Sequence, residues 1–128
     1  MKYLIYLNLA LTAILAMLTL THHSFVASGA ELKAPEAFKA SWYDEKSSCH
    51  YEGCLMANGE RFDEDKISCA SRQFYGQVLT IEYQGKTIEC PVKDKISKTY
   101  DATRIDLSRK AFSELENLDK GLIQVVIR

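Results

Sequence analysis

Short runs of β-type residues, separated by turn residues, fill most of this 128-residue chain after its first third. The clearest runs are residues 77–83 and 86–92, which are rich in β-branched side chains and flank Gln84-Gly85. Two alternating runs about a glycine-containing turn predict a β-hairpin. Pro91 has no backbone N–H, so we expect the second run to end there or to lie at a sheet edge. Three further runs of this kind predict strands over residues 38–43, 67–71 and 122–127.

One helix is predicted near the C-terminal end of this mainly β chain. Ser108 can cap a short helix that runs to about Asn117, and Gly121 is expected to stop it. Apolar residues recur here at intervals of three and four, as an amphipathic helix requires: Ala111, Phe112, Leu115 and Leu118. Residues 44–53 and 96–103 are polar and predict loops.

The first thirty residues have the pattern of an export signal. Lys2 precedes an apolar stretch over residues 3–20, and Ser28-Gly29-Ala30 offers the small side chains that signal peptidase requires. A lipoprotein needs a cysteine at the cleavage point, and the first cysteine is Cys49. We therefore expect residues 1–30 to be a signal peptide and the product to be soluble in the periplasm or outside the cell. The alternative is an uncleaved anchor, because an apolar run of about 18 residues can just span a bilayer.

The part that would remain after cleavage is small and close to neutral. Removal of thirty residues from 128 leaves 98, and because Lys2 is the one charge removed, the net charge changes from −1 to −2. A chain of this size forms one domain, which we place at residues 38–128 after a short linker at 31–37. Without a basic stripe, binding to nucleic acid through phosphate contacts is not expected, and we expect a monomer.

Four cysteines lie within the predicted domain: Cys49, Cys54, Cys69 and Cys90. A zinc site also uses four cysteines, but the usual C-x2-C pairs are missing, and export favours disulfides over a metal. Three pairings are possible. We favour Cys49–Cys54, which closes a short loop, and Cys69–Cys90, which joins segments that flank the predicted hairpin.

Four motifs follow one another along the domain: Ala40-Ser41-Trp42-Tyr43, Ala57-Asn58-Gly59-Glu60-Arg61-Phe62-Asp63, Val92-Lys93-Asp94 and Arg104-Ile105-Asp106-Leu107-Ser108. Their order and spacing resemble the RlpA-like double-psi β-barrel, a cell-wall glycan domain related to expansins. The resemblance implies a small six-stranded double-psi β-barrel with one short helix near the C-terminus. It also implies that the partner is peptidoglycan or another cell-wall polysaccharide.

Candidate catalytic residues follow from the resemblance rather than from spacing. Glycan cleavage needs a carboxyl group that protonates the leaving oxygen. Several carboxylates lie around the turns, namely Glu60, Asp63, Asp94, Asp101 and Asp106. By resemblance, Asp94 and Asp106 line the polysaccharide groove, and Glu60 comes next. Carboxylates that approach each other in a groove repel, which keeps one protonated as a general acid, and we assign that role to Asp94.

Other positions carry two interpretations. The alternative for Asp106 is a role at the start of the predicted helix, where an acidic side chain complements the helix dipole. Trp42 suits the core of a small barrel, whereas Ser41 and Tyr43 suit the glycan groove. In the RlpA-like transglycosylases a histidine follows the glutamate by eleven positions, and Ser71 takes its place here.

That replacement bears on activity, because serine cannot exchange protons near neutral pH as imidazole does. His50, the one histidine left after residue 30, is expected to be a surface residue. The leading hypothesis, by resemblance, is lytic transglycosylation of peptidoglycan, which gives a 1,6-anhydro product. The alternatives are an expansin-like module that binds polysaccharide without cleaving it, and a secreted barwin-like protein. No cofactor motif is present, so no cofactor is expected.

Overall fold

The computed structural model describes residues 36–50 and 53–128 of the chain. The predicted signal segment, residues 1–30, lies outside these residues, as does most of the predicted linker at 31–37. Within the described part, no helix is long and apolar enough to cross a membrane.

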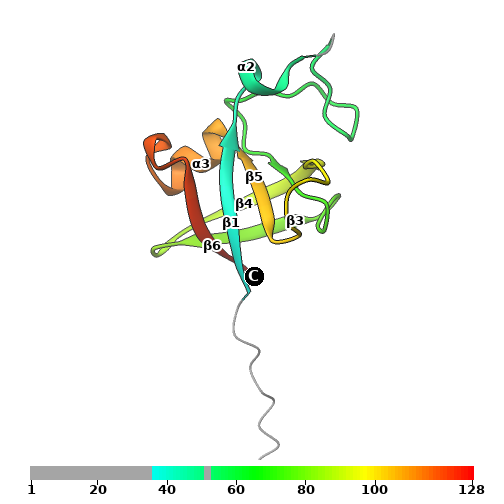
Figure 1. Cartoon of the computed structure of the whole chain (residues 1–128). Helices are drawn as coiled ribbons and strands as arrows, with labels where there is room; N and C mark the ends of the chain where they lie inside the picture. Colours follow the sequence, from blue (N-terminus) through cyan, green and yellow to red (C-terminus); the bar gives the residue numbers. More distant parts are fainter. Residues whose placement is uncertain (1–35, 51–52) are drawn as a thin grey trace, which may run out of the picture. The chain divides into compact units, whose positions relative to one another are not determined.

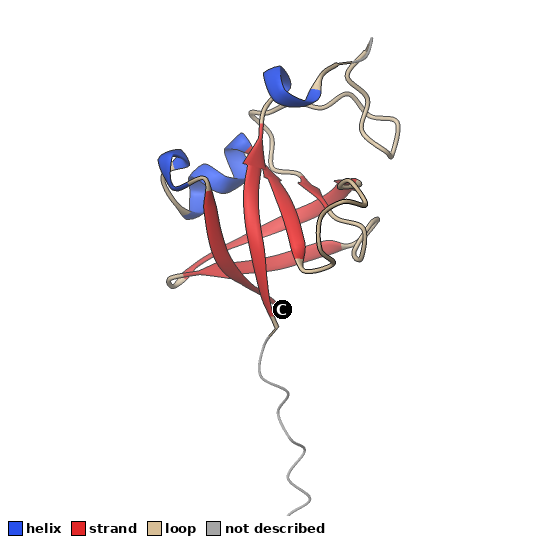
Figure 2. Ribbon diagram, in the orientation of Figure 1, coloured by secondary structure: helices blue, strands red, loops and turns tan. Residues whose placement is uncertain are grey.

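Six strands form a closed barrel in the order β1-β5-β2-β4-β3-β6, and β6 pairs with β1 to complete it (Figures 1 and 2). The strands are β1 (Ala37–Tyr43), β2 (Cys69–Ala70), β3 (Val78–Tyr83), β4 (Lys86–Asp94), β5 (Arg104–Ser108) and β6 (Leu122–Ile127). Two neighbouring pairs, β1 with β5 and β2 with β4, run parallel, and the other pairs are antiparallel. The predicted mainly β barrel of six strands is confirmed.

The predicted hairpin is also confirmed, but the expectation for Pro91 was wrong. Gln84 and Gly85 both have positive φ angles, 47° and 80°, which suits the tight turn between β3 and β4. β4 continues through Pro91 to Asp94 instead of ending at the proline. The β3 ladder ends at the pair Val78–Pro91 and the β2 ladder begins at Val92, so the proline lies where β4 changes its partner.

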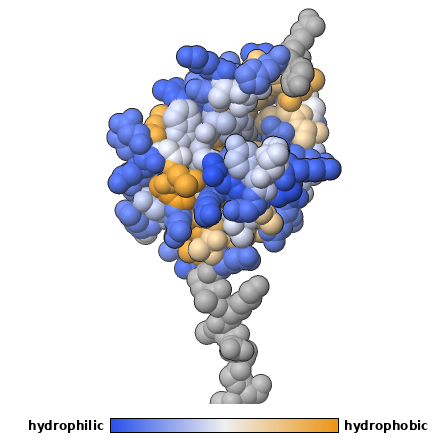
Figure 3. Space-filling view, in the orientation of Figure 1, coloured by the Kyte–Doolittle hydropathy of each residue, from blue (hydrophilic) through white to orange (hydrophobic). Residues whose placement is uncertain are grey.

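Apolar side chains fill the barrel interior. The buried strand residues alternate along the sequence, as a closed barrel requires: Phe38, Ala40, Leu79, Ile81, Ile88, Val92, Ile105, Leu107, Ile123 and Val125. Trp42 packs against this core, and its Nε1 donates a hydrogen bond of 3.0 Å to the Leu118 carbonyl, in agreement with the core interpretation. On the face in Figure 3, which is mostly hydrophilic, apolar residues form small separate spots.

The C-terminal helix α3 (Arg109–Leu115) follows β5 directly and packs against β4, β5 and β1. Ser108 caps it as predicted, since its hydroxyl accepts a hydrogen bond from the N–H of Ala111 at 3.2 Å. The helix ends two residues before the predicted Asn117, and a short 3-10 helix, η1 (Leu118–Lys120), precedes Gly121 at φ 66°. The predicted loop at 96–103 holds no helix or strand.

A short helix that the sequence reading did not predict, α2 (Glu45–Ser48), lies within the segment expected to be a loop, 44–53. Asp44 and Ser47 form a capping box, in which each side chain accepts a hydrogen bond from the other residue's backbone N–H, at 2.8 and 3.1 Å. The two reciprocal bonds satisfy donors that would otherwise be free at the start of so short a helix.

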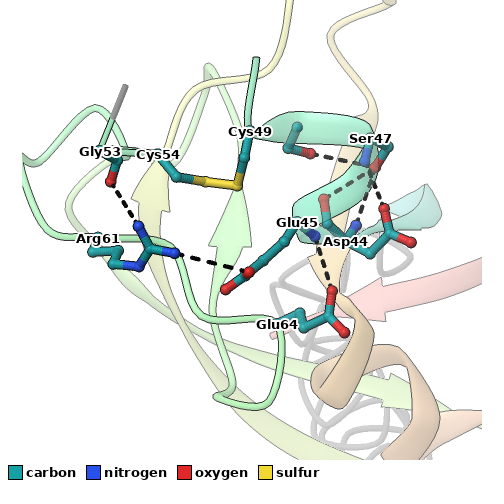
Figure 4. The surroundings of a disulfide bond; sticks show 9 residues. Asp44, Glu45, Ser47, Cys49, Gly53, Cys54, Arg61 and Glu64 are labelled. Carbon is teal, nitrogen blue, oxygen red and sulfur yellow. Dashed lines mark hydrogen bonds and ion pairs between the residues drawn. A yellow bond between two sulfur atoms is a disulfide. The ribbon is translucent and has the colours of Figure 1, made fainter. Parts of the chain in front are cut away.

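Both predicted disulfides are present. Cys49–Cys54 closes the segment after α2, where Arg61 reaches both the Gly53 carbonyl and the Glu45 carboxylate (Figure 4). Cys69–Cys90 joins β2 to β4 inside the core, and both residues are fully buried.

Candidate functional site

One row of residues crosses four neighbouring strands of the barrel. Ser41 on β1 pairs with Asp106 on β5, Asp106 pairs with Ala70 on β2, and Ala70 pairs with Asp94 on β4. Since neighbouring strands lie about 4.8 Å apart, the backbones of Asp94 and Asp106 are about 10 Å apart. The barrel topology therefore brings together two aspartates that are twelve positions apart in sequence.

The row faces outward from the barrel. Side chains alternate along a strand, and Ile105 and Leu107 are fully buried, so Asp106 between them projects to the outer face. The register between β2 and β4 shifts at Cys69/Ala70, so that Ala70 pairs with Asp94 rather than with Lys93. Such irregularities re-aim side chains, and here the shift aligns Asp94 with the row.

A groove of about 510 Å³ lies over this row. Its lining includes Tyr43, Ala70, Asp94 and Asp106, which come from β1, β2, β4 and β5. The remaining lining residues come from the end of α2 with the residues after it, and from the loop that joins β4 to β5. Two loops therefore form the walls of the groove and the barrel row forms its floor, and Asp94 and Asp106 both line it.

Asp106 forms an ion pair with Arg104 of its own strand, β5. The Ser41 hydroxyl donates a hydrogen bond to Asp106 Oδ1, and Arg104 Nε lies 3.3 Å from the same oxygen. Arg104 also donates to Ser41 Oγ from Nη2 at 2.5 Å. Ser41 is itself buried, so it reaches the groove through Asp106. These contacts connect Asp106 to Ser41 on β1 and to Arg104 on β5. The residue that caps α3 is Ser108 and not Asp106.

Asp94 is held in a different way. Its Oδ1 accepts hydrogen bonds from the backbone N–H of Ala57, at 2.9 Å, and of Lys95, at 2.8 Å. The ammonium of Lys95 lies 4.5 Å from the Tyr75 ring centroid rather than beside the carboxylate. Among the described residues Asp94 forms no ion pair, and its second oxygen accepts no hydrogen bond. Of the two aspartates, Asp94 therefore has the carboxylate that is more available to a ligand.

Tyr43 lines the groove with the two aspartates and also packs against a second, smaller apolar cluster formed by Cys54, Met56 and Phe62. Its ring stacks on Phe62 with centroids 4.5 Å apart. Within the described part of the chain, its hydroxyl is the one buried side-chain oxygen or nitrogen without a hydrogen-bond partner. Burial raises the pKa of Tyr43 well above its ordinary value, and the negative charges of Asp94 and Asp106 raise that pKa further. The phenol therefore stays protonated, and its hydroxyl is buried rather than open to a ligand in the groove.

The side chains of two predicted site residues do not line the groove. Glu60 forms an ion pair of 2.6 Å with Lys93 and lines a separate hollow of about 140 Å³. Ser71 is buried, and its hydroxyl accepts hydrogen bonds from the N–H groups of Gln73 and Phe74, at 3.2 and 3.4 Å. The fold thus brings Tyr43 together with the two aspartates. The backbone N–H of Ser71 donates to the Asp94 carbonyl at 3.0 Å, but neither the Ser71 nor the Glu60 side chain lines the groove.

Most residues that line the groove were not predicted as site residues, among them His50, Lys95 and Tyr100. His50 is exposed, as expected, but it also lines the groove. Lys95 and Tyr100 line the groove from the loop between β4 and β5. An aromatic side chain in an otherwise polar loop is the sequence signal by which Tyr100 could have been found. Among the described residues, no three His, Cys, Asp or Glu side chains lie close enough to hold a metal ion.

Comparison with known proteins gives one match among curated sequences and several among solved structures. The papain inhibitor of Streptomyces mobaraensis is 44% identical over 48 residues, which cover 38% of this chain and 33% of the inhibitor. The chain therefore matches about a third of the length of that curated relative.

The structural neighbours share the fold at low sequence identity. The solved Streptomyces papain inhibitor superimposes with a TM-score of 0.57 at 24% identity, over 73% of this chain and 93% of the inhibitor. The expansin of Clavibacter michiganensis superimposes with a TM-score of 0.54 at 21% identity, over 72% of this chain and 49% of that chain. A mutant of the same expansin, solved in complex with cellohexaose, gives a TM-score of 0.53 at 20% identity, with 72% and 49% of the two chains covered.

A family model described as lytic transglycolase matches residues 36–127, which include every strand of the barrel. This range is most of the chain, and it agrees with the closed six-stranded topology and with the neighbours above. The chain belongs to the RlpA-like double-psi β-barrel family.

Proposed function

We propose that the groove over Asp94 and Asp106 binds a cell-wall polysaccharide chain, and that the domain cleaves peptidoglycan as a lytic transglycosylase. The observation that carries the proposal is that two carboxylates from strands flanking β2 line one open groove. The description of the family model and the cellohexaose bound to an expansin mutant support a glycan as the ligand.

Asp94 is the proposed acid and base. Its carboxyl proton goes to the glycosidic oxygen between MurNAc and GlcNAc as the bond from that oxygen to MurNAc C1 breaks. The resulting carboxylate then takes the proton of the MurNAc 6-hydroxyl, whose oxygen forms a new bond to C1. The proton is returned to Asp94, no water is consumed, and the product carries a 1,6-anhydro ring. The absence of a cation beside Asp94 among the described residues supports this choice over Asp106.

Asp106 and Tyr43 are proposed to position the sugar. Asp106 keeps one oxygen on Ser41 and Arg104, and its charge favours the positive centre that develops at C1. Tyr43 lines the groove, so its ring is proposed to contact the sugar while its hydroxyl stays buried. Asp94→Asn is expected to abolish cleavage, whereas Tyr43→Ala, which removes the ring, is expected to weaken binding.

Digestion of purified peptidoglycan, with the products read by mass spectrometry, tests the proposal. We expect anhydro-muropeptides from the wild-type protein and none from Asp94→Asn. The matched control is Asp119→Asn, an exposed aspartate on η1 outside the groove, which should retain wild-type activity. Muropeptides with ordinary reducing ends would indicate hydrolysis and contradict the transglycosylase mechanism.

A second candidate function is binding without cleavage, and the position of Ser71 favours it. The residue that replaces the family's histidine is buried and caps a local turn, so it offers no proton-transfer group in the groove. Under this candidate the digest yields no products, while the wild-type protein still sediments with insoluble peptidoglycan, cellulose or chitin. Asp94→Asn and Asp106→Asn would then weaken sedimentation, because both carboxylates would be ligands of the polysaccharide.

A third candidate is a protein partner, favoured by the 44% identity to the papain inhibitor over 48 residues. Inhibition of papain by the purified protein tests it directly. A dose-dependent loss of papain activity, together with no binding to any of the three polysaccharides, would favour this candidate over the glycan groove.

We place the protein outside the cytoplasm. Both cysteine pairs are disulfide-bonded in the structure, and such bonds persist in oxidising compartments. The predicted signal segment at residues 1–30 supports the same location, either as a cleaved peptide or as an anchor.

A further inference from the structure

The most exposed aromatic ring of the groove belongs to Tyr100, in the loop that joins β4 to β5. Tyr100 is 47% exposed and lines the groove together with Asp94 and Asp106. Aromatic rings are normally buried, because they carry a large apolar surface, so an exposed ring in a groove needs an explanation.

Arg104 fixes the ring from one side. Its guanidinium lies 5.1 Å from the ring centroid of Tyr100 and also forms the ion pair of 3.3 Å with Asp106. A cation at this distance is attracted to the face of the ring. The arrangement therefore ties the ring of Tyr100 to the Asp106 side of the groove and leaves the rest of the ring open to solvent.

Arg72 fixes the backbone that carries the ring. Its Nη2 donates to the Tyr100 carbonyl at 2.5 Å, and its Nη1 donates to the Lys98 carbonyl at 3.3 Å. Farther along the same loop, Asp101 accepts hydrogen bonds from the N–H and the hydroxyl of Thr103, at 3.0 and 2.7 Å. Binding is weaker when a side chain has to become ordered on binding. These contacts order the Tyr100 backbone before a ligand binds, so they reduce that loss of affinity.

We propose that Tyr100 is a sugar-stacking residue that holds one neutral pyranose ring beside Asp106. The face of an aromatic ring carries partial negative charge, and the C–H groups on one face of a pyranose present an apolar, slightly positive surface to it. This inference rests on the proposed polysaccharide groove. It adds a binding subsite on the β4–β5 loop, opposite the wall that α2 provides.

A simpler role for Tyr100 is to cover Arg104 and so shield its ion pair with Asp106. Two variants separate the roles. Tyr100→Phe keeps a flat ring for stacking, whereas Tyr100→Leu keeps apolar cover over Arg104 and has no aromatic face. The matched control is Tyr75→Ala, because Tyr75 is also exposed and also has a cation over its ring, but it does not line the groove.

The test is calorimetric titration of the full chain with soluble glycan strands prepared from peptidoglycan, and separately with cellohexaose. We expect Tyr100→Leu to raise the Kd about tenfold, while Tyr100→Phe and Tyr75→Ala stay within about twofold of wild type. If wild type binds and Tyr100→Leu binds equally well, the stacking role is overturned and the groove proposal stands. If wild type binds neither glycan, the groove proposal fails, and the stacking role with it.

An activity readout distinguishes stacking from support of Asp106. Loss of stacking raises KM and leaves kcat close to wild type, because the reacting groups are untouched. A loss of kcat with an unchanged KM would show that Tyr100 acts through Asp106, and it would contradict the proposal.

Discussion

At the scale of single residues, Tyr43 combines a stability cost with a proposed ligand contact. Its hydroxyl is buried without a hydrogen-bond partner among the described residues, and such a group destabilises the folded state. We predict that Tyr43→Phe raises the free energy of unfolding by about 1 kcal/mol and Tm by roughly 4–8 °C. Thermal unfolding followed by circular dichroism checks this.

The control for this variant is Tyr83→Phe. The wild-type Tyr83 hydroxyl lies 3.1 Å from Gln84 Nε2 and 3.4 Å from Glu116 Oε2. That hydroxyl has partners, so its removal should bring no gain. A lower Tm for Tyr43→Phe than for wild type would show that the Tyr43 hydroxyl has a hydrogen-bond partner in solution, and it would contradict the prediction.

The raised pKa of Tyr43 predicts a loss of stability in alkali. In the unfolded chain its phenol ionises near the ordinary value of 10.0, whereas burial and the charge of Asp94 keep it protonated in the folded state. Above about pH 10 the unfolded state therefore binds fewer protons than the folded state, and the free energy of unfolding falls as the pH rises. Urea unfolding of wild type between pH 8 and 11 should show this fall, and Tyr43→Phe should show a smaller one. Equal slopes for the two proteins would contradict the assignment.

At the scale of elements, Ser108 joins β5, α3 and the loop that precedes β2. Its hydroxyl donates to the Lys66 carbonyl at 2.6 Å and accepts from the N–H groups of Ser68 and Ala111, both at 3.2 Å. Since Ser108 is fully buried, Ser108→Ala leaves these groups unsatisfied, and we predict a loss of about 2 kcal/mol in the free energy of unfolding. Ser113→Ala, which removes one exposed hydrogen bond on the same helix, should change stability by less than about 0.5 kcal/mol. Similar losses in the two variants, measured by urea unfolding, would contradict this role.

The two disulfides are predicted to have different effects. Cys69–Cys90 spans 21 positions and links β2 to β4 in the core, so its removal should cost about 3 kcal/mol. Cys49–Cys54 spans five positions at the groove wall, so its removal should cost about 2 kcal/mol or less and should mainly weaken glycan binding. Paired Cys→Ala variants, compared by urea unfolding and by sedimentation with peptidoglycan, check both parts. A larger loss of stability from the short loop would contradict the ranking.

Elements with a strong local signal were predictable from the sequence. The hairpin around Gln84-Gly85 and the helix capped by Ser108 depend on turn and cap residues that are visible in the chain. α2 was missed because the capping box pairs Asp44 with Ser47 rather than with the usual glutamate or glutamine. β4 passes Pro91 because the strand changes partner there, and the identity of a strand's partner is a tertiary property.

At the scale of the whole molecule, the site depends on registers that no single segment encodes. The motifs marked Asp94 and Asp106, but the row that aligns them depends on a register shift between β2 and β4. Motif matches also do not give side-chain direction, which is why Glu60 pairs with Lys93 away from the groove and Ser71 caps a turn. The same limit applies to Tyr100, whose place beside Asp106 is set by two arginines.

The outward row on β1, β5, β2 and β4 is the proposed polysaccharide-binding site. The most direct measurement is a ¹H–¹⁵N NMR titration of the protein with soluble peptidoglycan glycan strands, with resonances assigned. We predict shifts concentrated at Tyr43, Ala70, Asp94, Tyr100 and Asp106, and loss of these shifts in Asp94→Asn/Asp106→Asn. Shifts confined to the opposite side of the barrel, around the β3–β4 turn, or no shifts at millimolar glycan, would contradict the claim.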